Sequence, residues 1–202
     1  MSMPGRPGSR ADAVRNRQLA LDAATELLAC PDAPLTVEAI ARKAGLGAAT
    51  VVRAFGGKDA LLDAAVSRLL EPVVQRARDL LTETTPYQAL RIFLRELIAF
   101  QSAHYAVNAY LGDLDLPVTT ALQVGLVAAV EEMADGARRD GEIRTDLDPA
   151  VVKTLIEHTA HAIARVQPPS QDLADAYLAV LLDGLRPAPL PLPSAARTCG
   201  AN

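Results

Sequence analysis

Residues 36–61, TVEAIARKAGLGAATVVRAFGGKDAL, predict two short helices joined by a tight turn and followed by a third helix. Thr36 is suited to N-cap the first helix. The apolar residues of that helix follow helical spacing: Val37, Ile40, Ala41 and Ala44. Gly45 supplies the turn, and a second helix is expected over about 47–54. Two helices joined in this way form the unit that places its second helix in a DNA major groove.

The second helix of this unit is expected to turn one face inwards and the other towards a partner. Val51 and Phe55 face the core, while the outward side chains are Ala48, Ala49, Thr50, Val52 and Arg53. Small apolar side chains can contact a thymine methyl but cannot form paired hydrogen bonds with a purine edge. Arg53 is therefore expected to carry much of any direct base readout. A local salt bridge or a phosphate contact is the alternative for Arg53.

The order of the motifs resembles the N-terminal domain of the TetR family of bacterial transcriptional regulators. The motifs are Thr-Val-x-x-Ile-Ala, Ala-Gly-Leu, Thr-Val, Arg-x-Phe and Lys-Asp-Ala-Leu-Leu. The resemblance extends back to residues 15–28, which match the family's first helix, and it covers about fifty residues. It implies an all-α fold, in which an N-terminal three-helix helix-turn-helix domain precedes a C-terminal helical domain for ligand binding and dimerisation.

The same resemblance implies that Thr36, Thr50 and Lys58 approach the DNA backbone. Thr36 and Lys58 each stand at the start of a helix, where free backbone N–H groups favour an anion. Two positions depart from the family's pattern. Val52 replaces a common Tyr that contacts the DNA backbone, and Gly47 replaces a Ser at the start of the recognition helix. The predicted DNA-binding residues are Thr36, Ala48, Ala49, Thr50, Val52, Arg53 and Lys58.

Composition and charge agree with a helical DNA-binding protein. Ala and Leu dominate while only 3% of the residues are aromatic, which favours helices over strands. The net charge of −4 is unevenly distributed. Residues 1–60 hold eight Lys/Arg and six Asp/Glu, whereas residues 61–202 hold twelve and eighteen. Basic charge therefore lies with the helix-turn-helix, and DNA affinity should fall with salt.

The sequence predicts a cytoplasmic protein without a membrane partner. Residues 1–10, MSMPGRPGSR, have no apolar signal-peptide core, and the longest apolar stretch, residues 124–130, is too short to cross a bilayer. Cys30 and Cys199 lie far apart in the sequence. This spacing indicates free thiols rather than a disulfide framework or a metal site.

Four segments are expected along the chain. They are a flexible arm (1–12), the DNA-binding domain (13–60), a helical effector-binding and dimerisation domain (61–186) and a disordered Pro-rich tail (187–202). The helices expected in the second domain cover about 58–81, 86–103, a shorter segment to 110, 118–139, 150–166 and a last helix to 185. Pro72 should kink or break the first of these helices, because proline removes one backbone hydrogen bond.

The last two helices carry apolar stripes that core packing alone would explain. The resemblance implies instead that two such helix pairs form a four-helix dimer interface. A homodimer would span the two half-sites of a palindromic operator. The predicted interface residues are Leu155, Thr159, Ile163, Leu173, Tyr177, Val180 and Leu181.

Five of the seven aromatic residues fall within residues 87–110, which could line an apolar pocket with a few polar groups. Plain core packing is the alternative for most of them. The predicted pocket residues are Phe93, Phe100, His104, Tyr105, Tyr110, Gln123 and His158. The resemblance implies that a small-molecule effector bound there lowers DNA affinity, so that the protein would be a ligand-released repressor.

Two other functions fit the sequence less well. An enzyme could use His158 and His161, one helical turn apart, to hold a metal, but no HExxH motif, cysteine cluster or second ligand pair accompanies them. We therefore predict no catalytic residue, metal or cofactor. A TetR-like scaffold that acts through a protein partner is the other alternative, because Gly47 and Val52 depart from the family's DNA-binding pattern.

Overall fold

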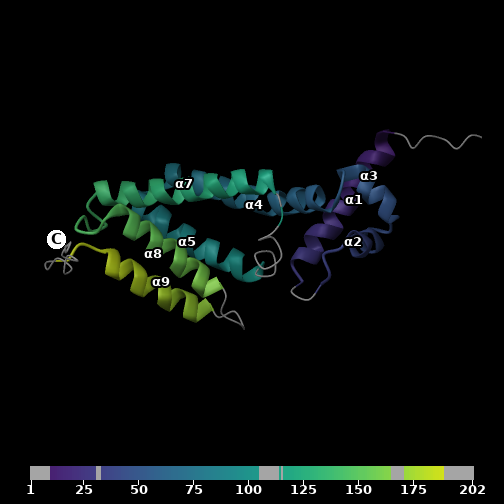
Figure 1. Ribbon diagram of the computed structural model, residues 1–202. Coiled ribbons are helices and arrows are strands. Elements are labelled where there is room, and N and C mark those ends of the chain that lie inside the picture. Colours follow the sequence, from purple (N-terminus) through teal and green to yellow (C-terminus); the bar gives the residue numbers. More distant parts are fainter. Residues whose placement is uncertain (1–9, 31–32, 105–113, 115, 165–170, 189–202) are drawn as a thin grey trace, which may run out of the picture. The chain divides into compact units, whose positions relative to one another are not determined.

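The computed structural model describes residues 10–30, 33–104, 114, 116–164 and 171–188, and all of its regular elements in these ranges are α-helices. The predicted all-α fold is confirmed. The helices are α1 (Arg10–Leu28), α2 (Val37–Ala44), α3 (Ala48–Phe55), α4 (Lys58–Glu83), α5 (Pro86–Ala103), α7 (Pro117–Arg139), α8 (Pro149–Ala164) and α9 (Gln171–Leu185) (Figure 1). None of the described helices has the length and apolar content that crossing a membrane requires.

Several predictions concern residues outside the described ranges. They are the arm up to residue 9, the short segment over 105–110, the end of the penultimate helix beyond 164 and the tail from 189 onwards. Helix α1 begins at Arg10, so that residues 10–12 of the expected arm are helical.

The chain forms two compact units. The first contains Met1–Arg76 with Ala103–Val127, and the second contains Ala77–Ser102 with Ala128–Asn202. Helices α4 and α7 each contribute residues to both units. The predicted domain boundary near residue 60 lies just after the start of α4. This boundary stays a prediction.

In the first unit, α1, α2 and α3 pack against one another (Figure 1). Their contact is built from small side chains on α1, such as Ala20 and Ala24, and from Ile40 of α2 and Val51 of α3, all of them buried. Alanines allow the helix axes to approach closely, while Ile40 and Val51 supply the apolar area whose burial stabilises the domain.

Helix α4 runs without a break through Pro72. The prediction of a break is therefore wrong, and the kink at Pro72 stays a prediction. Pro72 is exposed, while Leu70 and Val74 on either side of it are buried. Water can therefore hydrate the carbonyl that the missing N–H would have bonded, and the packing of the flanking turns outweighs the lost hydrogen bond.

A buried carboxylate on α4 caps the first turn of α7. Asp63 is only 6% exposed, and its side chain accepts hydrogen bonds from the backbone N–H groups of Val118 (3.1 Å) and Thr119 (2.8 Å). The Thr119 hydroxyl donates a third hydrogen bond at 2.7 Å. Burial alone would raise the pKa of Asp63, but hydrogen bonds from Thr119, Val118 and Ser67 outweigh it and hold this pKa below its ordinary value.

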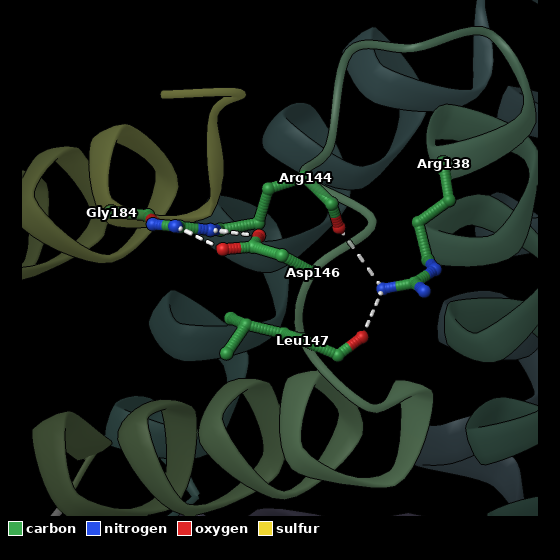
Figure 2. A network of polar contacts seen from close by, with 5 residues as sticks. All are labelled: Arg138, Arg144, Asp146, Leu147 and Gly184. Carbon is green, nitrogen blue, oxygen red and sulfur yellow. Dashed lines mark hydrogen bonds and ion pairs between the residues drawn. The ribbon is translucent and has the colours of Figure 1, made fainter. Parts of the chain in front are cut away.

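In the second unit, a chain segment after α7 is tied to the end of α9 (Figure 2). The Arg144 side chain forms a paired contact with Asp146, with both N–O distances at 2.6 Å, and also donates to the Gly184 carbonyl. The Arg144 backbone N–H donates to the Leu185 carbonyl at 2.8 Å. Arg138 of α7 donates to the carbonyls of Arg144 and Leu147 on the other side. This network fixes α9, which packs against α8.

Replacing Asp63 by Ala should lower the free energy of unfolding at pH 7 by about 2–3 kcal/mol, because two buried N–H groups and a hydroxyl lose a charged acceptor. Urea denaturation followed by circular dichroism measures the change. Asp140→Asn is the control, because Asp140 is exposed in the turn after α7. An equal loss in both variants would contradict the assigned role of Asp63.

The difference between wild type and Asp63→Ala should also depend on pH. The folded pKa of Asp63 is lowered, so its contribution is fully present above the unfolded pKa of about 3.9. It is lost as the pH falls through the folded pKa. Urea titrations from pH 7 to pH 3 should therefore show the two stabilities converging at the acidic end. A difference that stays constant over this range would show that the charge contributes nothing.

Candidate nucleic-acid interface

The turn between α2 and α3 is set by a cap at each end of α2. The Thr36 hydroxyl oxygen accepts a hydrogen bond from the Ala39 N–H at 3.1 Å, as the sequence predicts for an N-cap. Gly45 ends the helix in the left-handed conformation (φ 67°), with its N–H bonded to the Arg42 carbonyl. A side chain with a Cβ is strained at this φ, so glycine allows the chain to reverse sharply before α3.

Helix α3 begins and ends at glycines. Gly47 is the N-cap residue and contributes no side-chain hydrogen bond, unlike the Ser expected at this position. Gly56 ends the helix at φ 87°, and its N–H donates to the Val52 carbonyl at 2.7 Å. Helix α3 is therefore a short, sharply bounded element whose position depends on contacts with its neighbours.

The two faces of α3 differ in exposure. Val51 is 1% exposed and lies in the core, whereas Val52 is 43% exposed. Ala49 and Arg53 are also exposed, and Ala48 and Thr50 are half-buried. No described residue forms a hydrogen bond or ion pair with the Arg53 guanidinium, so the local salt bridge considered above is not observed.

The two predicted backbone-contact residues at helix starts are also accessible. Thr36 and Lys58 are exposed, and Lys58 is the first residue of α4. A cation beside the free N–H groups of a helix start is a suitable site for a phosphate. Together with Arg53 in the last turn of α3, Lys58 supplies positive charge close in sequence to the C-terminal end of α3.

Helices α2 and α3 together form what we call the reading head. Helix α1 holds it in place through contacts that no sequence pattern indicates. The Arg17 guanidinium donates to the Ala54 carbonyl in the last turn of α3 at 2.6 Å and lies 4.0 Å from the centre of the Phe55 ring. Glu26 forms an ion pair with Lys43 of α2 at 2.7 Å. Asp22 pairs with Arg68 of α4, and this hydrogen bond holds the pKa of Asp22 below its ordinary value.

Two family models match separate parts of the chain. One, described as bacterial regulatory proteins of the tetR family, matches residues 20–65, which contain α2 and α3. The other, described as the C-terminal domain of SbtR-like transcriptional regulators, matches residues 85–187, just over half of the chain. The chain belongs to the TetR family of bacterial transcriptional regulators.

Solved structures of TetR-family regulators resemble this protein along nearly their whole length. A TetR transcription regulatory protein from Mycobacterium vanbaalenii is 32% identical with a TM-score of 0.60, and the match covers 88% of this chain and 99% of that chain. A TetR transcriptional regulator from Streptomyces coelicolor is 30% identical with a TM-score of 0.56, covering 85% and 99%. FadR from Bacillus subtilis, solved in complex with stearoyl-CoA, shares the fold at 17% identity (TM-score 0.67, covering 84% and 99%). No curated protein matches the chain.

The residues predicted for the effector pocket of this TetR-family protein have different environments. Phe93 of α5 is fully buried and belongs to the core of the second unit. Phe100 and His104 are half-buried, while Gln123 and His158 are exposed. The His158 Nδ1 lies 2.9 Å from the Thr154 carbonyl oxygen of its own helix. Tyr105 and Tyr110 lie outside the described residues, and the pocket stays a prediction.

The residues predicted for the dimer interface lie on α8 and α9 and are mostly accessible. Val180 is 74% exposed, Tyr177 49% and Leu155 42%. The half-buried members are Thr159, Leu173 and Leu181. Ile163 is buried within the single chain, so its side chain contributes to the core of that chain.

Replacing Arg17 by Ala should lower the free energy of unfolding by about 1–2 kcal/mol, because α3 loses one hydrogen bond and one cation–π contact. Urea denaturation measures this change, and hydrogen exchange should show faster opening of α3. Arg15→Ala removes an exposed neighbouring arginine that has no partner among the described residues. If Arg15→Ala produced the same effects, the contacts of Arg17 with α3 would not be their cause.

Proposed function

We propose that this TetR-family protein is a homodimeric repressor that binds a palindromic operator through α3 and leaves it when a small-molecule effector binds. The observation that carries the proposal is the outward face of α3, where Arg53 is exposed and has no partner among the described residues. An exposed arginine on a recognition helix can donate two hydrogen bonds to the O6 and N7 acceptors of a guanine.

The proposed DNA contacts divide into base and backbone contacts. Arg53 reaches base edges with Ala48, Ala49 and Val52 beside it, while Thr36, Thr50 and Lys58 contact phosphates. The surplus of basic residues in residues 1–60 supports this division, because the acidic remainder of the chain would repel DNA. A protein that acts on chromosomal DNA in a bacterium works in the cytoplasm, where we place this one.

The proposed dimer interface is the surface formed by α8 and α9, which lie side by side in the second unit (Figure 1). Leu155, Tyr177 and Val180 expose apolar area there that a second copy would cover. Tyr177 and Val180 are one helical turn apart and share a face of α9. Two copies would present two reading heads, which gives a weak half-site reader the specificity of a full palindrome.

The proposed effector is a small molecule taken up by the helical domain. FadR of Bacillus subtilis, which has the same fold, was solved in complex with stearoyl-CoA. This supports a ligand for the present protein as well, without indicating which one. We propose no catalytic step, and a scaffold that acts through a protein partner is the alternative that Gly47 and Val52 leave open.

Selection from a random DNA library at two salt concentrations tests the proposal. We expect enrichment of a palindrome whose affinity falls with salt and falls at least tenfold in Arg53→Ala, because each half-site loses a contact worth about 1–3 kcal/mol. Arg91→Ala, which removes an exposed arginine of α5, should bind as wild type does. If no sequence is enriched at low salt, the partner-binding alternative replaces the repressor.

The dimer is tested by placing a charge on the exposed surface of α9. Val180→Glu should convert the protein to a monomer in analytical ultracentrifugation at micromolar concentration, because an unpaired carboxylate is costly in an apolar interface. Val124→Glu is the matched control, since Val124 is 65% exposed on α7, outside the proposed interface. A dimer of unchanged stability in Val180→Glu would place the interface elsewhere.

A further inference from the structure

The exposed face of α3 is almost devoid of hydrogen-bonding side chains. Residues 48, 49, 52 and 53 are neighbours on this face, because residues three or four apart in a helix lie side by side. They are Ala48, Ala49, Val52 and Arg53, and only Arg53 carries a polar group. Thr50 is half-buried and lies away from the centre of this face.

Val52 is the unusual member of this face. Its neighbour Val51 is 1% exposed and packs in the core, whereas Val52 is 43% exposed. The outer part of the Val52 side chain therefore adds little to the packing of the described part of the chain. A phosphate would gain nothing from an isopropyl group, because an apolar side chain offers no charge or donor. A branched apolar side chain at this position instead matches an apolar group on the partner.

The major groove presents one such group. Every base edge there offers hydrogen-bond donors or acceptors, and the C5-methyl of thymine is the apolar exception. An α-helix fits the major groove, so that side chains at the exposed face of α3 would meet the base edges. A thymine methyl against Val52 would remove the exposed apolar area of both groups from water.

We infer that this protein also recognises its operator through thymine C5-methyl groups packed against Val52 and Ala49, with Arg53 bound to a guanine close by. The inference rests on the proposed DNA-binding function and adds the chemistry by which bases are chosen. It follows that each half-site contains a thymine near a guanine. It also follows that affinity depends on a methyl group that takes no part in base pairing.

Deoxyuridine tests this inference directly, because it pairs as thymidine does and lacks only the C5-methyl. Two random libraries of the same design, one made with thymidine and one with deoxyuridine, are selected in parallel with the full-length protein. The operator enriched from the thymidine library is then resynthesised with deoxyuridine at one symmetric pair of positions at a time. Its dissociation constant is measured by fluorescence anisotropy at one fixed salt concentration.

We expect one symmetric pair of positions at which deoxyuridine weakens binding about 15-fold. This is about fourfold for each of two methyl groups, or about 0.8 kcal/mol per methyl at 1.4 kcal/mol per tenfold change. In Val52→Ser the ratio between the two DNAs should approach one at the same positions. Serine and valine have similar helix propensity, so this variant leaves α3 intact. Val124→Ser on α7, also an exposed valine, should keep the full ratio.

The outcomes separate the inference from the function on which it rests. Enrichment from both libraries, with equal affinity for thymidine and deoxyuridine operators at every position, would overturn the methyl readout and leave the repressor intact. A methyl effect of equal size in wild type and Val52→Ser would assign the effect to the DNA itself and overturn the role of Val52. Failure of both libraries at low salt would overturn the DNA-binding function and with it the inference, leaving Val52 to a protein partner.

Discussion

The left-handed backbone of Gly45 is the constraint on which the reading head depends. At φ 67° the chain leaves α2 and turns within the three residues 45–47, and this turn sets the direction of α3. That direction places Val51 inwards and leaves Val52 and Arg53 outwards. A residue with a Cβ would strain this conformation, and a shifted turn would rotate the buried face of α3 away from the core.

A short helix defined by its turn still needs to be held, and α1 does this. Helix α3 has eight residues, no side-chain N-cap and one fully buried valine, which is little for an element that must meet DNA in one orientation. Arg17 binds the carbonyl end of α3, where the helix dipole favours a cation. The same helix pairs with α2 through Glu26 and with α4 through Asp22. The position of the recognition helix is thus set by a helix that is not itself part of the helix-turn-helix.

These contacts mark the boundary of what the sequence could predict. The ends of the helices could be predicted because they depend on local residues: Thr36 caps α2, and Pro86 is the first residue of α5. The burial of Val51 and the exposure of Val52 follow from the helical period of α3. The Arg17–Ala54 and Asp63–Thr119 contacts join residues 37 and 56 positions apart, and no periodicity or motif connects such positions. At Pro72 the local rule allowed a break that is not observed, because the buried turns on either side of it keep α4 continuous. Which residues of α3 face outwards could therefore be predicted in part, and the residues that position α3 could not.

The Asp63 cap joins the first turn of α7 to the helix that follows the helix-turn-helix. Asp63 stands on α4 five residues after Lys58, and Arg68 one turn further along α4 pairs with α1. The first turn of α7, the start of α4 and the reading head therefore form one mechanically connected unit. Moving α7 away from α4 would leave a buried carboxylate and two backbone N–H groups unsatisfied, at a cost of several kcal/mol. The first turn of α7 therefore stays bound to the start of α4 unless another interaction offsets that cost.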